Sequence, residues 1–207
     1  MGLMKKFFNQ TRKPEGTLGK IMLSTMNSGH AKMADWGMAH LPEIHPKAVA
    51  DLGCGAGRNA GALLKRYPQA HVTAIDYSEL SVQKATEYNQ QMIDAGRCTV
   101  CQGNVSALDL PAESIDLATA FETVYFWPGL EKCFAQVAKA LKPGGMFLIC
   151  NESDGEDAAG TKFENMIEGM KCYTTGEIEA ALRKVGFSEV KSDHYSGKPW
   201  ITVLARK

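Results

Sequence analysis

The sequence predicts an α/β fold: a seven-stranded, mostly parallel sheet with helices on both faces and an antiparallel terminal strand. Three observations predict it. From Lys47 onward, short apolar runs alternate with segments of helical periodicity, a pattern typical of parallel sheets covered on both faces. Glycines at alternate positions, Gly53, Gly55 and Gly57, follow the first run directly. The chain closes with two short strands around the turn at 196–199, and such a hairpin supplies an antiparallel strand.

The strands are indicated by short runs of apolar and β-branched residues between turn residues and helical segments. Pro111 to Ser114, for example, is a turn that separates one such run from the next. The expected strands are residues 47–52, 72–76, 98–103, 115–121, 146–151, 187–194 and 201–205.

The helices are indicated by apolar spacing and by their end signals. Ser78 is an N-cap and Gly96 ends the same helix. The segment 14–41 precedes the sheet and predicts two short helices broken near 27–29. The remaining expected helices are residues 58–66, 130–141 and a segment from Thr175 to the residue before Gly186. We therefore expect an N-terminal helical cap or lid over 1–45 and a ligand-binding domain over 46–207.

Composition and charge limit the partners of the chain. Lysine plus arginine equals aspartate plus glutamate, 23 each, in 207 residues, so charge gives no reason to expect a nucleic-acid partner. No apolar run approaches the ~20 residues of a membrane span, and no secretory signal is apparent. The spacing of Cys98 and Cys101 on one strand would turn their sulfurs apart. We expect a cytoplasmic monomer or homodimer without a metal site, a nucleic-acid partner or a membrane partner.

The glycine loop between the first strand and the helix after it predicts a nucleotide-like ligand. Glycines let backbone approach a ligand closely, and the following helix offers free N–H groups and a positive dipole end. Two interpretations compete. Residues 55–60 fit the dinucleotide pattern G-x-G-x-x-G/A, with the acid Asp76 further on. Counted from Gly53, however, the loop is G-x-G-x-G, with Arg58 in the place of the third fingerprint glycine and Asp51 just before the turn.

The second interpretation resembles motif I, (D/E)-x-G-x-G-x-G, of the class I S-adenosylmethionine-dependent methyltransferases, whose fold is Rossmann-like. Further landmarks similar to that family follow in the family's order, and the resemblance covers about residues 47 to 207. They are Asp76 after the second strand, Gly103-Asn104-Val105 in place of G-D-A, the run 114–118, the turn Leu141 to Gly145, and Gly186-Phe187.

The resemblance implies a transferase of class EC 2.1.1.- that uses S-adenosylmethionine and releases S-adenosylhomocysteine. It implies that Asp76 binds the ribose hydroxyls, and that residue 104 contacts the adenine amino group. Asn104 departs from the family's Asp, but its side-chain oxygen can also accept a hydrogen bond. The expected cofactor-binding residues are Asp51, Gly53, Cys54, Gly55, Gly57, Asp76, Tyr77, Asn104, Val105 and Phe121.

The acceptor side is predicted to lie between the Met-rich segment 14–41 and the residues after the fourth strand. Methionine and aromatic side chains suit an adaptable apolar pocket for a small molecule, and a base is required only where the acceptor loses a proton. We expect His30, Glu122 and Tyr125 as catalytic candidates. The expected pocket residues are Met26, Met33, Trp36 and Trp127.

Two alternatives stay open at this point. The first is an NAD(P)-dependent Rossmann oxidoreductase, which would use the dinucleotide interpretation of the loop. The second is a module that binds S-adenosylmethionine without turning it over. The identity of the methyl acceptor, and whether methyl is transferred to O, N, S or C, is not encoded in any of these motifs.

Overall fold

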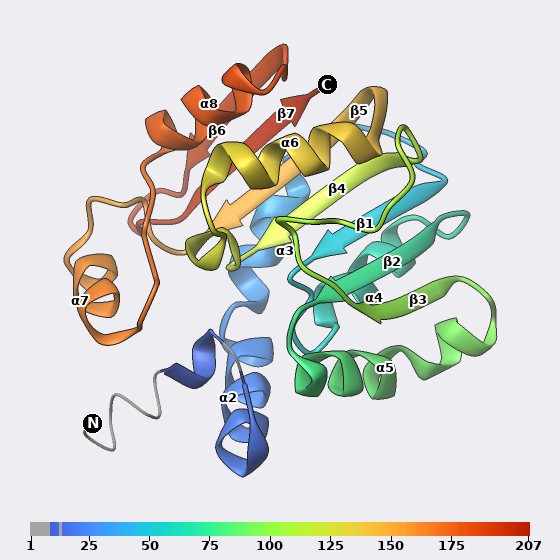
Figure 1. Ribbon diagram of the computed structural model, residues 1–207, viewed down its shortest axis with the longest axis horizontal. Coiled ribbons are helices and arrows are strands. Elements are labelled where there is room, and N and C mark those ends of the chain that lie inside the picture. Colours follow the sequence, from blue (N-terminus) through green and yellow to red (C-terminus); the bar gives the residue numbers. More distant parts are fainter. Residues whose placement is uncertain (1–8, 13) are drawn as a thin grey trace.

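A computed structural model describes residues 9–12 and 14–207, without the side chains of residues 9 and 24–28. Its centre is a seven-stranded sheet of order β3-β2-β1-β4-β5-β7-β6 (Figure 1). The strands are β1 (Ala48–Leu52), β2 (His71–Asp76), β3 (Cys98–Gln102), β4 (Ile115–Phe121), β5 (Leu141–Asn151), β6 (Glu189–His194) and β7 (Ile201–Arg206). The helices are η1 (Asn9–Thr11), α2 (Gly16–Gly29), α3 (Ala31–Ala39), α4 (Arg58–Arg66), α5 (Glu79–Asp94), η2 (Val124–Phe126), α6 (Leu130–Ala140), α7 (Ala158–Met166) and α8 (Thr175–Lys184).

The sheet has the predicted directions. Strands β1 to β5 pair in parallel, β7 runs antiparallel to β5, and β6 pairs antiparallel with β7. This confirms the expected α/β class and the antiparallel terminal strand. Since β1, β2, β4 and β5 are parallel, the residues that follow them in the chain meet at one edge of the sheet.

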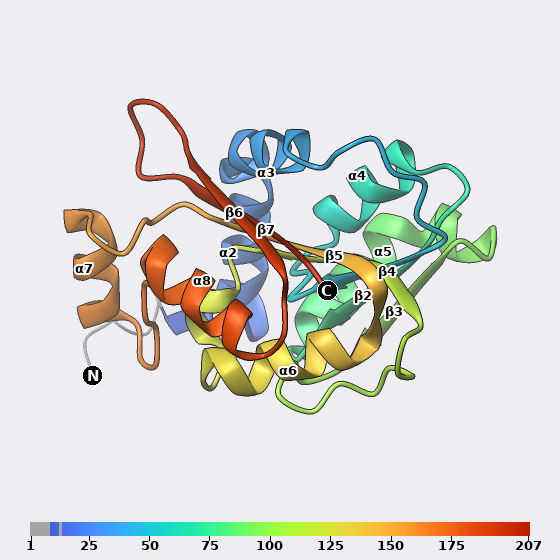
Figure 2. The ribbon, with the colours of Figure 1, turned by 90° about the horizontal axis from the view of Figure 1, so that it is seen from above.

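Two buried clusters hold helices on opposite faces of the sheet (Figure 2). Neighbouring strand residues alternate between them, as Val49 and Ala50 do, because successive side chains of a strand point to opposite faces. Helices α3, α4 and α5 contribute to one cluster. Helices α6 and α8 contribute to the other.

Two elements differ from the expectation. β5 begins at Leu141 rather than at residue 146, because Leu141 already pairs with Ile115 before the register shifts at the Lys142–Gly145 turn. Residues 158–166 form the helix α7, which was not predicted. Asp157 caps it, since its Oδ1 accepts the Gly160 N–H at 2.7 Å.

Helix α2 lies beside the edge toward which β1, β4 and β5 point (Figure 1), and helix α3 packs against one face of the sheet. The break between α2 and α3 is at His30. Helix α3 lies close on β5, because a Cβ at Gly37 would come within 2.5 Å of the Cys150 Sγ. None of the helices in the described part of the chain has the length and apolar character that spanning a bilayer requires.

Candidate functional site

A cavity of about 250 Å³ opens at the carboxyl edge of β1, β2 and β4. Its walls come from the glycine loop, the residues after β2 and β4, and the N-terminal helices. The described residues that line it are Thr11, Arg12, Pro14, Leu23, His30, Ala31, Gly53, Cys54, Gly55, Ala56, Arg58, Asn59, Ile75, Asp76, Tyr77, Ser81, Gly103, Asn104, Val105, Phe121, Glu122, Thr123, Phe126, Trp127 and Pro128.

The glycine loop forms one wall in a backbone conformation that requires glycine. Gly53 and Gly55 have φ angles of 75° and 53°, a region that L-residues with a side chain rarely adopt. A Cβ at Gly53 would lie 2.0 Å from the Thr123 Oγ1, so this glycine allows the loop after β4 to approach. A Cβ at Gly55 would meet no atom within 4 Å. It would project into open space at the cavity wall, where a ligand can reach the backbone.

Asp76 ends β2 and lies at the cavity with its carboxylate held by the backbone. Its Oδ2 accepts the Gly55 N–H at 2.9 Å and its Oδ1 accepts the Ser78 N–H at 2.9 Å. Burial raises the pKa of this carboxyl group, and these hydrogen bonds oppose the shift. A carboxylate has about four acceptor positions, so both oxygens can still accept hydroxyl groups of a ligand.

Asp51 lies beneath the glycine loop and is 1% exposed. Its Oδ1 accepts the Thr119 hydroxyl at 2.8 Å, whereas its Oδ2 is buried without a hydrogen-bond partner among the described residues. Burial raises the pKa of Asp51 to about 7; the Thr119 hydroxyl opposes the shift and the charge of Asp76 adds to it. Asp51 itself does not line the cavity, nor does Gly57, which begins α4.

The remaining expected cofactor residues, Cys54, Tyr77, Asn104, Val105 and Phe121, all line the cavity. One detail differs from the expectation. The Asn104 Oδ1 already accepts the Ser106 N–H and the Ser106 hydroxyl, each at 2.9 Å. Because both of its lone pairs are engaged, this oxygen is not free to accept an adenine amino group in the arrangement observed.

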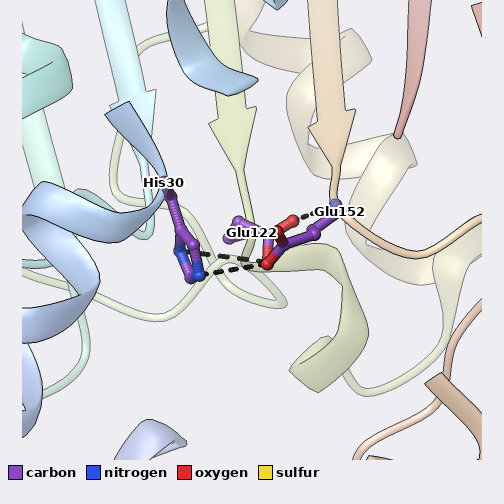
Figure 3. Close-up of side chains that lie close together, drawn as sticks. All are labelled: His30, Glu122 and Glu152. Atoms are coloured by element: carbon purple, nitrogen blue, oxygen red, sulfur yellow. Dashed lines mark hydrogen bonds and ion pairs between the residues drawn. The ribbon is translucent and has the colours of Figure 1, made fainter. Parts of the chain in front are cut away.

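Three side chains, His30, Glu122 and Glu152, converge beside the cavity (Figure 3), and His30 and Glu122 line it. His30 comes from the α2–α3 break, Glu122 follows β4 and Glu152 follows β5. The His30 Nε2 lies 3.3 Å from the Glu152 Oε2, and the His30 Nδ1 lies 4.0 Å from the Glu122 Oε2. Both ring nitrogens therefore have a carboxylate nearby.

Glu122 has a positive φ of 57° although it is not glycine. Strained backbone of this kind persists where surrounding contacts fix it, and it is frequent at functional sites. The Glu122 Oε1 accepts the Tyr125 hydroxyl at 3.0 Å and also the Glu152 N–H. Tyr125 in turn accepts the Ser153 N–H at 2.9 Å and does not line the cavity. Tyr125 therefore orients the Glu122 carboxylate by a hydrogen bond and does not face the cavity.

The environment of the cluster shifts the pKa values of Glu122 and His30 upward. Burial raises the pKa of Glu122 to about 7, and the charge of His30 opposes that shift. Burial would lower the pKa of His30, but its hydrogen bond to Glu152 and the charges of Glu122 and Glu152 together raise it. A proton can therefore move on and off this cluster in the physiological range.

The same three residues form a set that could hold a metal ion, since one ligand atom from each lies within 4.8 Å of the others. The sequence analysis expected no metal site. Neighbouring side chains also bind its two carboxylates. The Trp200 indole N–H donates to the Glu152 Oε1 at 3.4 Å, and the Tyr125 hydroxyl donates to the Glu122 Oε1. These contacts orient both carboxylates through the protein's own groups.

The four expected pocket residues are placed differently from one another. Trp127 lines the cavity. Met33 is 1% exposed and packs in the core against Cys150, because α3 turns this side chain toward the sheet. Trp36 contacts Tyr195 of the β6–β7 hairpin. Met33 and Trp36 do not line the cavity. The Met26 side chain lies outside the described residues.

Some residues of the site were expected only as parts of a segment. Leu23 lies in the segment 14–41, Thr123 and Phe126 follow the fourth strand, and all three line the cavity. Arg12, which reaches the cavity from the chain before α2, and Glu152 were not predicted. Glu152 carried a usable signal, since it follows the buried strand β5 at the edge where Asp76 and Glu122 also lie. The others become neighbours of the site only through the packing of α2 and of the turn after β4.

The chain is similar in sequence to known methyltransferases. Residues 49–145 match the family model described as a methyltransferase domain. The chain is 26% identical over 174 residues to a sterol 24-C-methyltransferase of Pneumocystis carinii, an alignment covering 76% of this chain and 45% of that protein. The chain thus spans about half the length of the curated relatives it matches.

Solved structures share the fold over nearly the whole chain. A chain from the complex between the Haloferax volcanii Trm112 methyltransferase activator and a methyltransferase superposes with a TM-score of 0.84 at 18% identity, covering 99% of both chains. An S-adenosylmethionine-dependent methyltransferase of Mesorhizobium loti superposes with a TM-score of 0.70 at 22% identity, covering 84% of this chain and 98% of that one.

Proposed function

Because the chain belongs to the class I S-adenosylmethionine-dependent methyltransferase family, we propose that it transfers a methyl group from S-adenosylmethionine to a small-molecule acceptor. The observation that carries the proposal is the arrangement of Asp76 and the glycine loop around one cavity. The same family membership does not favour the NAD(P)-dependent oxidoreductase.

The residues present fit S-adenosylmethionine, the cofactor of this family. The open wall at Gly55 leaves room for a ligand against the backbone, and the unpaired Asp51 Oδ2 is a buried acceptor beneath the same loop. Asp76 would bind the ribose diol, a charge-assisted arrangement. Asp51 would orient the amino-acid end through a polar intermediary, because it does not reach the cavity itself.

The rest of the cofactor would be held by less polar walls. Tyr77 and Val105, which line the cavity, would flank the adenine ring. Asn104 would contribute through its amide group or its backbone, since its carbonyl oxygen is engaged by Ser106. The segment 1–45, of which 9–12 and 14–45 are described, would act as a cap over this side.

When bound, S-adenosylmethionine supplies an electrophilic methyl group on a sulfonium. The protein's own contribution is to align the acceptor and to exclude water. Phe121, Phe126 and Trp127 provide an apolar wall at the acceptor end. Glu122, paired with His30, would accept a proton at its Oε2 where the acceptor has one to lose.

The proposal is tested by incubating the purified chain with S-adenosylmethionine that carries a labelled methyl group and a panel of small amines, phenols, thiols and sterols. Transfer of label to any of them, lost in Asp76→Ala, supports the proposal. Binding of the cofactor without transfer to any acceptor would instead favour the non-catalytic module.

A sterol acceptor is the second candidate, favoured by the relatives, which are sterol C-methyltransferases. The cavity of about 250 Å³ is the one in which the cofactor is also placed, so its volume does not discriminate between a sterol and a compact acceptor. The sterol arm of the same panel separates these two acceptors.

A further inference from the structure

We infer that the acceptor end of the cavity binds a compact amine in its ammonium form, with Glu122 as its anionic partner and its proton acceptor. This inference names the acceptor class of the proposed methyl transfer and rests on that proposal. It is carried by the charge balance of the cavity wall, by its aromatic residues and by the position of Glu122 at the wall.

The charges at the two ends of the cavity differ. Among the described residues that line it, those with a carboxylate, a guanidinium or an imidazole are Arg12, His30, Arg58, Asp76 and Glu122. Arg58 is paired with Asp35 at 2.5 Å, and the Arg12 guanidinium donates to the Glu168 carbonyl at 3.2 Å. At the acceptor end, the Glu122 carboxylate lines the cavity. The Glu152 carboxylate does not line it; it lies against the His30 imidazole, and the charge of Lys198 also acts on it. The cavity wall at that end therefore carries the negative charge of Glu122 once this carboxylate is ionised.

The apolar part of the same wall is aromatic. Phe121, Phe126 and Trp127 line the cavity beside Glu122. The Trp127 indole N–H donates to the Thr123 hydroxyl at 3.2 Å, which fixes the ring next to the loop that carries Glu122. The Trp127 ring also stacks on Phe147 in the core, with ring centroids 6.2 Å apart, so one of its faces is covered. Aromatic side chains beside a carboxylate suit a cation that carries an apolar body. An alcohol or phenol would gain nothing comparable from the anionic wall.

The proton of the ammonium must leave before nitrogen can attack. Glu122 can take it, because this residue lines the cavity and, among the described residues, the nearest partner of its Oε2 is the His30 ring at 4.0 Å. The nitrogen lone pair would then form the N–C bond while the S–C bond breaks with its electron pair going to sulfur. The product is a methylated ammonium, the sulfur leaves as a neutral thioether, and the first proton remains on Glu122, so charge and atoms balance.

The test compares amines with alcohols of the same shape by calorimetry on the whole chain at about pH 8, first without cofactor and then with S-adenosylhomocysteine. Three pairs serve as probes: 2-phenylethylamine with 2-phenylethanol, cyclohexylamine with cyclohexanol, and butylamine with butanol. We expect at least one amine to bind about tenfold more tightly than its alcohol. Equal affinities in all three pairs, or no binding by any probe, would overturn the inference.

Two variants show whether Glu122 carries the preference. Glu122→Gln keeps the shape and an acceptor oxygen for Tyr125, and it should bring amine and alcohol to within about twofold. Glu131→Gln removes an exposed carboxylate that pairs with Lys184 on α8, and it should leave the preference unchanged. A preference that survives in a folded Glu122→Gln chain would also overturn the inference; thermal unfolding confirms the fold of both variants.

The two proposals fail separately in this design. If S-adenosylhomocysteine binds and no amine is preferred, the acceptor class is wrong and methyl transfer stands. If amines are preferred and S-adenosylhomocysteine does not bind, the amine site stands and methyl transfer fails.

Discussion

The His30 Nε2 lies 3.3 Å from the Glu152 Oε2, although one residue precedes the sheet and the other follows its fifth strand (Figure 3). The contact joins the N-terminal helices to the carboxyl edge of the sheet. Through it, the cap segment contributes an imidazole to the wall of a cavity whose other end is built by the glycine loop.

The rate of methyl transfer should rise with pH through about 7 in the wild-type chain, since burial raises the pKa of Glu122 to about that value and a base acts in its ionised form. Tyr125→Phe should move the midpoint of this rise to higher pH. The Tyr125 hydroxyl donates to the Glu122 carboxylate, and a donor stabilises the charged form. Initial rates at saturating cofactor, measured from pH 5.5 to 9, check this. An unmoved or lowered midpoint would contradict the role given to Tyr125.

Gly53→Ala should destabilise the fold more than Gly197→Ala. Both glycines have positive φ angles, 75° and 83°, so both variants carry similar backbone strain. Only Gly53 faces a side chain, Thr123, at 2.0 Å, while Gly197 has no atom within 4 Å. Overpacking typically costs 1–3 kcal/mol, so we expect a difference of about 2 kcal/mol in the free energy of unfolding by urea. Equal losses would show that the Thr123 contact does not constrain the loop.

Asp51→Asn should flatten the dependence of stability on pH. The folded pKa of Asp51 is raised from 3.8 to about 7, mainly by burial, so the native state binds a proton that the unfolded chain has released. Stability is then present at low pH and is lost as pH rises through the folded pKa. Between pH 5 and 8 the free energy of unfolding of the wild-type chain should fall by up to about 3 kcal/mol more than that of the variant.

Urea unfolding of both chains at these two pH values measures the loss. Asp94→Asn, an exposed position at the end of α5, is the matched control and should behave as the wild type. A parallel pH dependence in Asp51→Asn and the wild type would rule out a strongly raised pKa at this position.

The part of the cavity beside the glycine loop could be predicted from sequence because its residues lie in short contiguous segments. Gly53 and Gly55 come just after β1 and Asp76 ends β2, and a parallel sheet brings such strand ends to one edge. The details of Asn104 could not be predicted in the same way. Its engagement with Ser106 depends on the local turn that the backbone adopts after β3.

The acceptor half depends on packing between segments far apart in the chain. Met-rich composition drew attention to the segment before the sheet, but none of the described methionine side chains of that segment lines the cavity, because composition does not say which face of α3 meets β5. The close approach at Gly37 turns Met33 into the core, and the break at His30 directs the imidazole to the cavity. Glu152 joins the site only because β5 ends beside β4.

The central claim is that Asp76 and the glycine loop form a site for S-adenosylmethionine, and calorimetry of cofactor binding tests it most directly. We predict micromolar binding to the wild-type chain, unchanged in Asp94→Ala and reduced by about a hundredfold or more in a folded Asp76→Ala chain, since a buried charge-assisted pair of hydrogen bonds is lost. Undetectable binding to the wild-type chain at millimolar cofactor, or equal affinity in Asp76→Ala, would contradict the account.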